Sequence, residues 1–362
     1  MKLVMAMKVR DEGDVLDENL RYHRAQGVDQ FIVTDNGSTD ETPEILRRWE
    51  GERLLRLIEE PSTDEFRDQA HWWVTRMARM AATELDADWV VHADADEFWS
   101  PVSGTLKEAL EGIPDEYGVV LAPRPEFPAR PDAGPFWERM TVREARSRLR
   151  PKIAHRAIPD AVLHRGAHDV DVERDESGAL HSGRAVMRAV KPTREATEDK
   201  LMWAPMWPAR VLHFPLRSFD QYKRKVEVTL AGGFDDKAHD ELRIAYEDGR
   251  LPDLYAKLVE DDASVEEGLR EGRLVEDRTV ADFLGGGVAP PRSPEEAERD
   301  RNDLTQDAME TLARTQRSLI RQLDNFRSRL AKQRRRADRA QGGRKGRLRS
   351  SAARVLRQRR EA

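Results

Sequence analysis

Short apolar runs alternate with amphipathic stretches along the first third of the chain. Five runs rich in branched and aromatic residues are typical of strands, at Leu3 to Val9, Phe31 to Thr34, Leu54 to Ile58, Trp89 to His92 and Val119 to Ala122. The stretches between them have helical spacing, so the pattern predicts βαβ units and an α/β fold with a mostly parallel sheet. Ligands of such sheets bind at the carboxyl ends of the strands, where we expect the functional residues.

The pattern changes after the fifth strand. Residues 123–217 are richer in Pro, Arg and His and indicate loops, short strands and small helices, whereas helical spacing returns from Ser218 to about Glu260. Three glycines and three prolines between Leu284 and Pro294 indicate a linker. We therefore predict five segments, at 1–122, 123–283, 284–300, 301–331 and 332–362.

An amphipathic helix is expected after the linker, over 301–331. Its apolar positions have spacings of seven, four, three and four residues, at Leu312, Leu319, Leu323, Phe326 and Leu330. Such spacing is typical of a short coiled coil, which would join copies of the chain through 304–330. A helix that folds back on the body of the protein would show the same pattern, so both interpretations stay open.

Composition restricts the class of protein. Hydrophobic residues make up 38% of the 362 residues and charged residues 36%, a balance typical of a soluble globular enzyme. No apolar run approaches the roughly 18 residues that cross a bilayer. The apolar start of the chain runs into Arg10 without a signal-peptide cleavage site, and the chain has no cysteine. We expect a cytoplasmic protein without disulfides or thiolate chemistry.

Charge is unevenly distributed. Residues 332–362 contain thirteen Lys and Arg against two Asp and Glu, so this tail carries +11 and leaves −17 on the rest of the chain, since the total is −6. An acidic body argues against nucleic acid as the main substrate. The tail is either a disordered, solvated segment or a peripheral contact with an anionic membrane, at its inner face.

A first polar cluster, from Thr34 to Pro43, lies where a strand ends and a helix begins. Ser38 and Glu41 have the spacing of a capping box, and Gly37 permits a positive φ in the turn. The alternative to a binding loop is a well-capped turn that binds nothing.

A second cluster, Asp94-Ala95-Asp96, follows the strand that ends at His92. In an extended segment these two carboxylates point the same way, and they would repel each other unless a cation neutralised them. Hard oxygen ligands of this kind suit Mn²⁺ or Mg²⁺ shared with phosphate oxygens. The alternative, a solvated acidic turn, is disfavoured by the apolar residues on both sides.

Together the two clusters resemble those of GT-A glycosyltransferases of the family-2-like group. That group has an "NE" element, a "DNGSTD" loop and a "DADEF" metal motif, which match Asp11-Glu12, residues 35–40 and residues 94–98, with Asp11 in place of the usual asparagine. Later elements also match, in chain order: Arg67 and Gln69, residues 150–153, and residues 212–219 with Lys225. The resemblance covers roughly residues 1 to 230.

The resemblance implies a GT-A fold in which residues 1–122 bind a nucleotide-sugar, linked to uridine or guanosine diphosphate. It implies that the base lies near Glu12 and Asp35, and that ribose and phosphates pass Arg67, Gln69 and Asp94. It also implies a cation held by Asp94, Asp96 and His213. Positive charge near the pyrophosphate is expected from Lys152 or, as alternatives, Arg150 or Lys225.

The resemblance further implies an inverting transfer of the sugar to a hydroxyl acceptor, in the synthesis of a cell-surface polysaccharide or glycoconjugate. Direct displacement needs a base that deprotonates the acceptor, and the candidates are Asp169 and His168. His164 and His168 are four residues apart, but no third ligand accompanies them, so a metal pair there is disfavoured.

Two other functions stay open. A metal-dependent nucleotidyltransferase would use the same carboxylates, although no Gly-rich phosphate loop is present. A non-catalytic scaffold of the same fold would account for Asp11 and for the absence of a clearly identified base.

Overall fold

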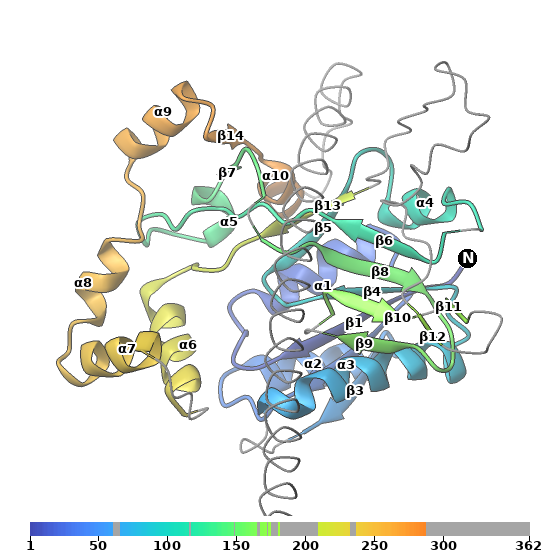
Figure 1. Ribbon diagram of the computed structural model, residues 1–362. Helices are drawn as coiled ribbons and strands as arrows, with labels where there is room; N and C mark the ends of the chain where they lie inside the picture. Colours follow the sequence, from blue (N-terminus) through green and yellow to red (C-terminus); the bar gives the residue numbers. More distant parts are fainter. Residues whose placement is uncertain are drawn as a thin grey trace, which may run out of the picture. The chain divides into compact units, whose positions relative to one another are not determined.

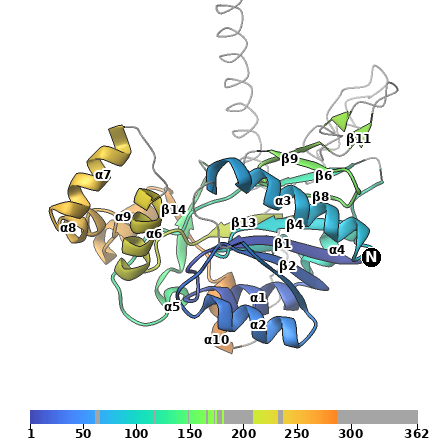
Figure 2. The same cartoon turned by 90° about the horizontal axis from the view of Figure 1, so that it is seen from below.

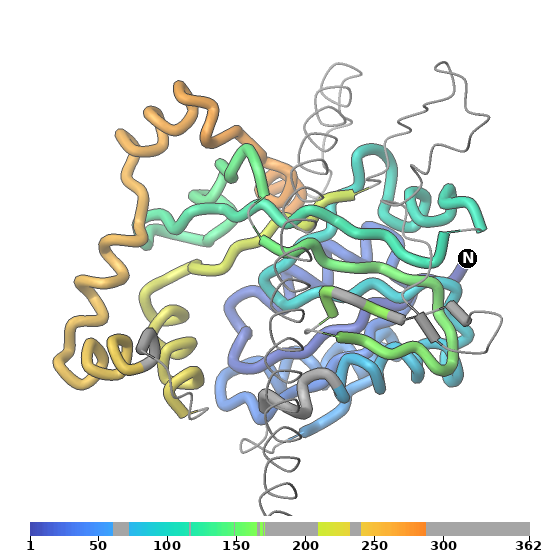
Figure 3. The backbone as a smooth tube through the Cα atoms, in the orientation of Figure 1, coloured from blue at the N-terminus to red at the C-terminus, as the bar shows by residue number. Residues whose placement is uncertain are grey.

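The computed structural model describes most of the first 286 residues (Figures 1 and 3), namely 1–60, 66–115, 117–147, 149–164, 167–171, 173–174, 180–181, 209–231 and 237–286. The predicted coiled coil at 304–330 and the basic tail at 332–362 lie outside these residues. In the described part, no helix is both long and apolar enough to cross a membrane.

A six-stranded sheet forms the centre of the structure. Its strands lie in the order β3 (Leu55–Glu59), β2 (Gln30–Asp35), β1 (Leu3–Val9), β4 (Trp89–Ala93), β8 (Lys152–Arg156) and β6 (Val119–Ala122). The first four are parallel, and β8 is antiparallel to both of its neighbours. The predicted α/β class and mostly parallel sheet are confirmed, and all five predicted strands are present.

Helices cover both faces of the sheet because alternate strand residues point to opposite sides. On one face, Leu3 and Met5 pack in a buried cluster with residues of α1 (Leu16–Ala25) and α2 (Thr42–Gly51). On the other, Val4 and Ala6 pack with residues of α3 (Phe66–Thr83). Figure 2 shows α3 on the opposite side of the sheet from α1 and α2. The inner strands β1, β2 and β4 are buried on both faces, as their continuous apolar runs predict, whereas the edge strand β3 exposes Arg56 and Glu59.

The other strands after β4 pair two by two outside the central sheet. Strand β5 (Glu97–Pro101) pairs with β13 (Ala209–His213), and β7 (Val142–Glu144) pairs with β14 (Leu274–Glu276). Short pairs join β9 (Val162–His164) with β10 (Asp169–Asp171), and β11 (Glu173–Arg174) with β12 (Leu180–His181). The remaining helices are α4 (Leu106–Glu111), α5 (Phe136–Arg139), α6 (Phe219–Ala231), α7 (Lys237–Glu247), α8 (Leu251–Ala256), α9 (Asp262–Arg270) and α10 (Thr279–Gly286).

Three local predictions differ from the structure. Ser38 and Glu41 do not form a capping box, because α2 begins at Thr42 and the side chain of its N-cap residue, Glu41, accepts no capping hydrogen bond. The helix α10 extends to Gly286, so the first residues of the predicted linker at 284–300 are helical. Asp94 to Asp96 form a turn, in which the Glu97 N–H donates to the Asp94 carbonyl, and are not an extended segment.

Candidate active site

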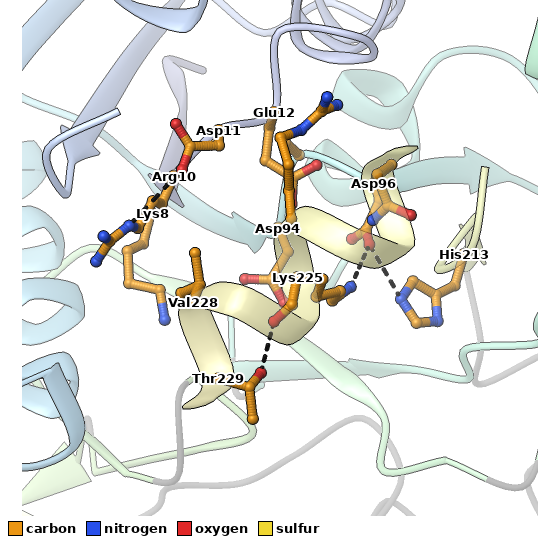
Figure 4. A pocket seen from close by; sticks show the side chains of 13 residues that line it. Lys8, Arg10, Asp11, Glu12, Asp94, Asp96, His213, Lys225, Val228 and Thr229 are labelled. Carbon is orange, nitrogen blue, oxygen red and sulfur yellow. Dashed lines mark hydrogen bonds and ion pairs between the residues drawn. The ribbon is translucent and has the colours of Figure 1, made fainter. Parts of the chain in front are cut away.

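A pocket of about 280 Å³ opens at the carboxyl ends of β1 and β4. Four parts of the chain line it: the end of β1, the β4–β5 turn, the end of β13 and one face of α6 (Figure 4). The lining residues are Lys8, Arg10, Asp11, Glu12, Asp94, Ala95, Asp96, His213, Gln221, Arg224, Lys225, Val228 and Thr229. The site therefore lies where ligands of parallel sheets bind, and it unites Glu12, Asp94, Asp96 and His213, which are far apart in sequence.

The loop after β1 is held by hydrogen bonds to the loop after β2. Asp11 has a φ of 53°, and its carboxylate accepts hydrogen bonds from the Thr39 N–H at 2.7 Å and from the Thr39 hydroxyl at 3.2 Å. Its own N–H donates to the Ser38 hydroxyl at 2.9 Å. Asn and Asp both tolerate this backbone region and offer the same acceptor oxygen, so the structure explains how Asp11 can stand in place of asparagine.

The Asp35 side chain makes its hydrogen bonds within its own loop. Its carboxylate accepts hydrogen bonds from the Ser38 hydroxyl at 2.5 Å and from the Ser38 N–H at 3.2 Å. It is not among the residues that line the pocket. Its predicted contact with a nucleotide base therefore stays a prediction, while its role in shaping the loop is direct.

Asp94 is held by a buried network behind the pocket wall. The Lys152 ammonium, 2% exposed, lies 2.7 Å from the Asp94 carboxylate and 2.8 Å from that of Glu97. Glu97 in turn accepts a hydrogen bond from Arg124 at 2.5 Å. Burial alone would raise the pKa of Asp94, but Lys152 and Lys8 outweigh it and lower the pKa to about 2. Asp94 is therefore anionic and fixed in position.

Asp96 is surrounded by a different set of cations. Its carboxylate lies 3.5 Å from the Lys225 ammonium, 3.6 Å from His213 Nε2 and 3.7 Å from the Arg217 guanidinium. Burial opposes ionisation, yet Lys225, His213 and Arg217 together hold the pKa of Asp96 well below its usual value. The two aspartates thus share a pocket but have different partners.

Arg217 connects the carboxylates on this side of the site. Its side chain is 1% exposed and donates to Glu12 at 2.5 Å, to both oxygens of Asp14 at 2.8 and 2.9 Å, and to the Phe214 carbonyl at 3.1 Å. Burial raises the pKa of Glu12 to about 7, against the opposing charge of Arg217. Sequence reasoning missed Arg217 as a site residue, although it lies inside the segment 212–219 that carries part of the resemblance.

His213 lies between two carboxylates. Its Nε2 faces Asp96, and its Nδ1 lies 3.3 Å from a carboxylate oxygen of Glu126. Burial would lower the pKa of His213, but Asp96 and Glu126 raise it to about 9. The ring is protonated near neutral pH, so it must release a proton before it can bind a metal ion.

The carboxylates fit a divalent cation that a substrate helps to bind. Asp96 and His213, whose Nε2 lies 3.6 Å from the Asp96 carboxylate, are the residues that would hold such a cation together with Asp94. No group of three or more Asp, Glu or His side chains able to hold a metal occurs among the described residues. Mg²⁺ commonly takes one or two carboxylates and completes its shell with phosphate oxygens and water. The residues therefore fit a cation whose shell the diphosphate completes.

The other predicted site residues lie elsewhere or outside the described side chains. Arg67 and Gln69 are on α3, and Asp169 is on β10, but the side chains of all three fall outside the described part. Lys152 is buried behind Asp94 and does not line the pocket, and Arg150 is exposed. His168 Nδ1 donates to the Pro151 carbonyl at 2.7 Å, and burial together with Lys152 lowers its pKa to about 4.

Comparison with known proteins supports an enzyme of the predicted kind. Residues 11–168 match the family model of Glycosyltransferase family 92. The matched segment contains two of the four parts that line the pocket, the loop after β1 from Asp11 onward and the β4–β5 turn. The match supports the prediction of a glycosyltransferase. It does not confirm the predicted family-2-like group. No curated protein matches the chain significantly.

Several solved structures are similar to parts of the chain. TarS of S. aureus, in complex with UDP-GlcNAc, is 13% identical over 67% of this chain and 70% of its own, with a TM-score of 0.32. The mannosyltransferase PcManGT of Pyrobaculum calidifontis, in complex with GDP-Man and Mn²⁺, is 17% identical over 86% and 87%, with a TM-score of 0.31. Glucosyl-3-phosphoglycerate synthase of Mycobacterium tuberculosis is 18% identical over 38% and 46%, with a TM-score of 0.23.

Proposed function

We propose that this chain is a metal-dependent glycosyltransferase that moves a sugar from a uridine or guanosine diphosphate donor to a hydroxyl acceptor, with inversion. One observation carries the proposal: Asp94, Asp96 and His213 line one pocket at the carboxyl ends of β1 and β4. Two of the four parts that line that pocket, the loop after β1 from Asp11 onward and the β4–β5 turn, lie in the segment that matches a glycosyltransferase family.

Asp96 and Asp94 would hold Mn²⁺ or Mg²⁺, with His213 as a further ligand after it loses its proton. When bound, such a cation stabilises the negative charge that develops on a departing diphosphate. The chain supports this arrangement by keeping both carboxylates anionic, through Lys152 at Asp94 and through Arg217 and Lys225 at Asp96. Each carboxylate is therefore charged before any ligand arrives.

Lys225 is the lysine best placed to meet the leaving group. Its side chain is 49% exposed, and within the described residues its ammonium has two polar contacts, each of 3.5 Å, to Asp96 and to the Pro215 carbonyl. Lys152, by contrast, is enclosed and makes two short ion pairs. We therefore assign charge stabilisation at the diphosphate to Lys225, and we assign to Lys152 the fixing of Asp94.

Glu12 would contact the nucleoside. One of its carboxylate oxygens is bound by Arg217, and the side chain lines the pocket. The other oxygen can accept a hydrogen bond from a ribose hydroxyl or a base N–H. Arg217 thus orients the group that would read the nucleoside.

His168 has an unprotonated ring nitrogen near neutral pH. Because its Nδ1 donates to a carbonyl oxygen, which can only accept, the neutral ring has a bare Nε2. The lowered pKa of His168, about 4, keeps this ring neutral near pH 7. We propose His168 as the base that deprotonates the acceptor hydroxyl, with Asp169 as the alternative.

The cellular setting belongs to the same proposal. We propose a cytoplasmic enzyme that acts on a precursor of a cell-surface polysaccharide or glycoconjugate. Its tail, with thirteen Lys and Arg, would bind the anionic inner face of the membrane by charge attraction that weakens with salt, and residues 304–330 would join copies of the chain.

The test is cation and nucleotide binding by an Asp96→Asn variant, which removes one charge without removing volume. Mn²⁺ binding is followed by electron paramagnetic resonance, and uridine and guanosine diphosphate binding by calorimetry. We expect wild type to bind Mn²⁺ more tightly with the nucleotide than without it, and the variant to lose this enhancement. Asp115→Asn, at a fully exposed carboxylate, is the control and should behave as wild type.

Two results would redirect the assignment. If neither Mn²⁺ nor either nucleotide binds to wild type, the non-catalytic scaffold becomes the better account. If Asp96→Asn binds Mn²⁺ and nucleotide as wild type does, the metal role of the β4–β5 turn is wrong.

A further inference from the structure

One face of α6 forms a wall of the pocket. The residues of that face are spaced three, one, three and one apart, which places them on one side of a helix, at Gln221, Arg224, Lys225, Val228 and Thr229. Lys223, the neighbour of Arg224, does not line the pocket and lies 4.0 Å from Glu227 one turn along the helix. The helix therefore presents two adjacent cations, Arg224 and Lys225, to whatever enters.

Most cations around this site already have carboxylate partners. Lys152 lies between Asp94 and Glu97, Arg217 binds Glu12 and Asp14, and Arg124 binds Glu97. These groups stabilise the site from behind its wall, and none of the three lines the pocket. They cannot turn toward a ligand without leaving a buried carboxylate unpaired.

Arg224 differs from those three cations. Its Nε atom is shielded from solvent and has no hydrogen-bond partner in the part of the chain that the structure describes. No ion pair joins Arg224 to a described carboxylate. Leaving a shielded donor without a partner costs free energy that an incoming acceptor would recover.

Arg10 also lines the pocket and, like Arg224, has donor groups that are not fully paired within the described residues. Its Nε atom is also shielded and makes no hydrogen bond within the described residues. Its ion-pair partner, the Asp11 carboxylate, lies 3.8 Å away and already accepts two hydrogen bonds from Thr39 (Figure 4). The guanidinium of Arg10 is therefore only loosely held.

Two guanidinium groups with open donors on one pocket are suited to an anion with several oxygens. The planar fork of arginine matches phosphate oxygens in pairs, and charge-assisted hydrogen bonds of this kind are stronger than neutral ones. The carboxylates of the same pocket do not compete, because Asp94 and Asp96 are held by the cations described above.

We propose that Arg224, together with Arg10, binds phosphate oxygens of the donor's diphosphate directly, so that part of the donor affinity needs no divalent cation. The identity of the ligand rests on the proposed function. The existence of a diphosphate site on α6 does not, because inorganic pyrophosphate has the same oxygens without the nucleoside or the sugar.

The test measures binding of inorganic pyrophosphate and of uridine and guanosine diphosphate to the full chain, by calorimetry in the presence of EDTA. Arg224→Gln removes the guanidinium. Lys223→Gln makes the same change of charge one residue away on the same helix, outside the pocket, and is the matched control. Arg224→Lys keeps the charge but loses the fork, and thermal melting confirms that each variant is folded.

We expect wild type to bind pyrophosphate and one of the nucleotides without metal. Arg224→Gln should weaken both about tenfold to a hundredfold, the loss of one or two charge-assisted hydrogen bonds. Arg224→Lys should recover part of that loss, and Lys223→Gln should match wild type. Binding that Arg224→Gln leaves unchanged, or that Lys223→Gln weakens equally, overturns the proposal.

The same variants, also incubated with Mn²⁺ and nucleotide-sugars, separate this inference from the assignment of activity. If pyrophosphate binding depends on Arg224 but no nucleotide-sugar is consumed, the diphosphate site stands and the glycosyltransferase proposal fails. If nucleotides bind to wild type only when Mn²⁺ is added, and pyrophosphate does not bind in EDTA, the cation-independent contact is refuted while the enzyme assignment stands.

Discussion

Replacement of Arg217 by glutamine tests how much the site depends on its buried arginine. The change removes one positive charge and leaves Glu12 and Asp14 without the group that binds both. Removing one partner of a buried ion pair costs about 3 to 5 kcal/mol. Glu12 and Asp14 are 18% and 27% exposed, so water can hydrate them in part, and we expect the lower end, about 3 kcal/mol.

The assay is urea unfolding of the full chain, followed by circular dichroism. Arg217→Lys should lose less than Arg217→Gln, because it keeps the charge but satisfies fewer acceptors. Arg243→Gln is the matched control: Arg243 is 46% exposed and pairs with Asp240 at 3.3 Å on α7, where a surface pair contributes less than about 1 kcal/mol.

The nucleotide affinity of Arg217→Gln should also fall, since Glu12 loses the group that orients it. If Arg217→Gln unfolds at the same urea concentration as wild type, the argument that Arg217 organises this side of the pocket is refuted.

Three further predictions concern other parts of the fold. Asp11→Asn should be nearly neutral because it keeps the acceptor and tolerates the positive φ, whereas Asp11→Ala should lose about 1 to 2 kcal/mol in thermal or urea unfolding. Burial lowers the pKa of His23 to about 3 and that of His155 to about 4. As the pH falls below 6.5, both side chains therefore bind a proton in the unfolded chain but not in the folded one. Their stabilisation is complete above the unfolded pKa near 6.5 and should fall by about 2 kcal/mol for each by pH 5, so the loss of stability between pH 7.5 and 5 should be larger in wild type than in His155→Gln, and equal losses in the two would contradict this. Asp277→Asn leaves the buried Arg143, 2.8 Å away, without its anion and should cost about 3 kcal/mol, measured in the same way; a loss below 1 kcal/mol would show that β7 and β14 hold together without that pair.

Sequence patterns predict the central strands because local burial determines them. β1, β2 and β4 are enclosed on both faces and therefore appear as continuous apolar runs, whose bounds agree with the structure to within one residue at each end. The position of the β8 strand between β4 and β6 is not predictable in this way, since it depends on a pairing between residues 63 to 67 positions apart.

The chemistry of the pocket is only partly visible in the sequence. The prediction that Asp94 and Asp96 share a pocket is consistent with the structure, although the period-two argument for it does not apply to a turn. The Ser38 hydroxyl does not cap α2, because its oxygen accepts from the Asp11 N–H and its O–H donates to Asp35, contacts that join the two loops. Arg217 and Arg224 look like any other of the 62 Lys and Arg residues until the fold shows that Arg217 lies among carboxylates and that Arg224 lines the pocket.

The most direct measurement of the central claim is incubation of the purified chain with Mn²⁺ and a panel of uridine and guanosine diphosphate sugars, with product analysis. We expect that at least one donor is consumed, that a nucleoside diphosphate is released, and that Asp96→Asn abolishes the release. Release of pyrophosphate in place of the nucleoside diphosphate, or equal turnover by Asp96→Asn, would contradict it.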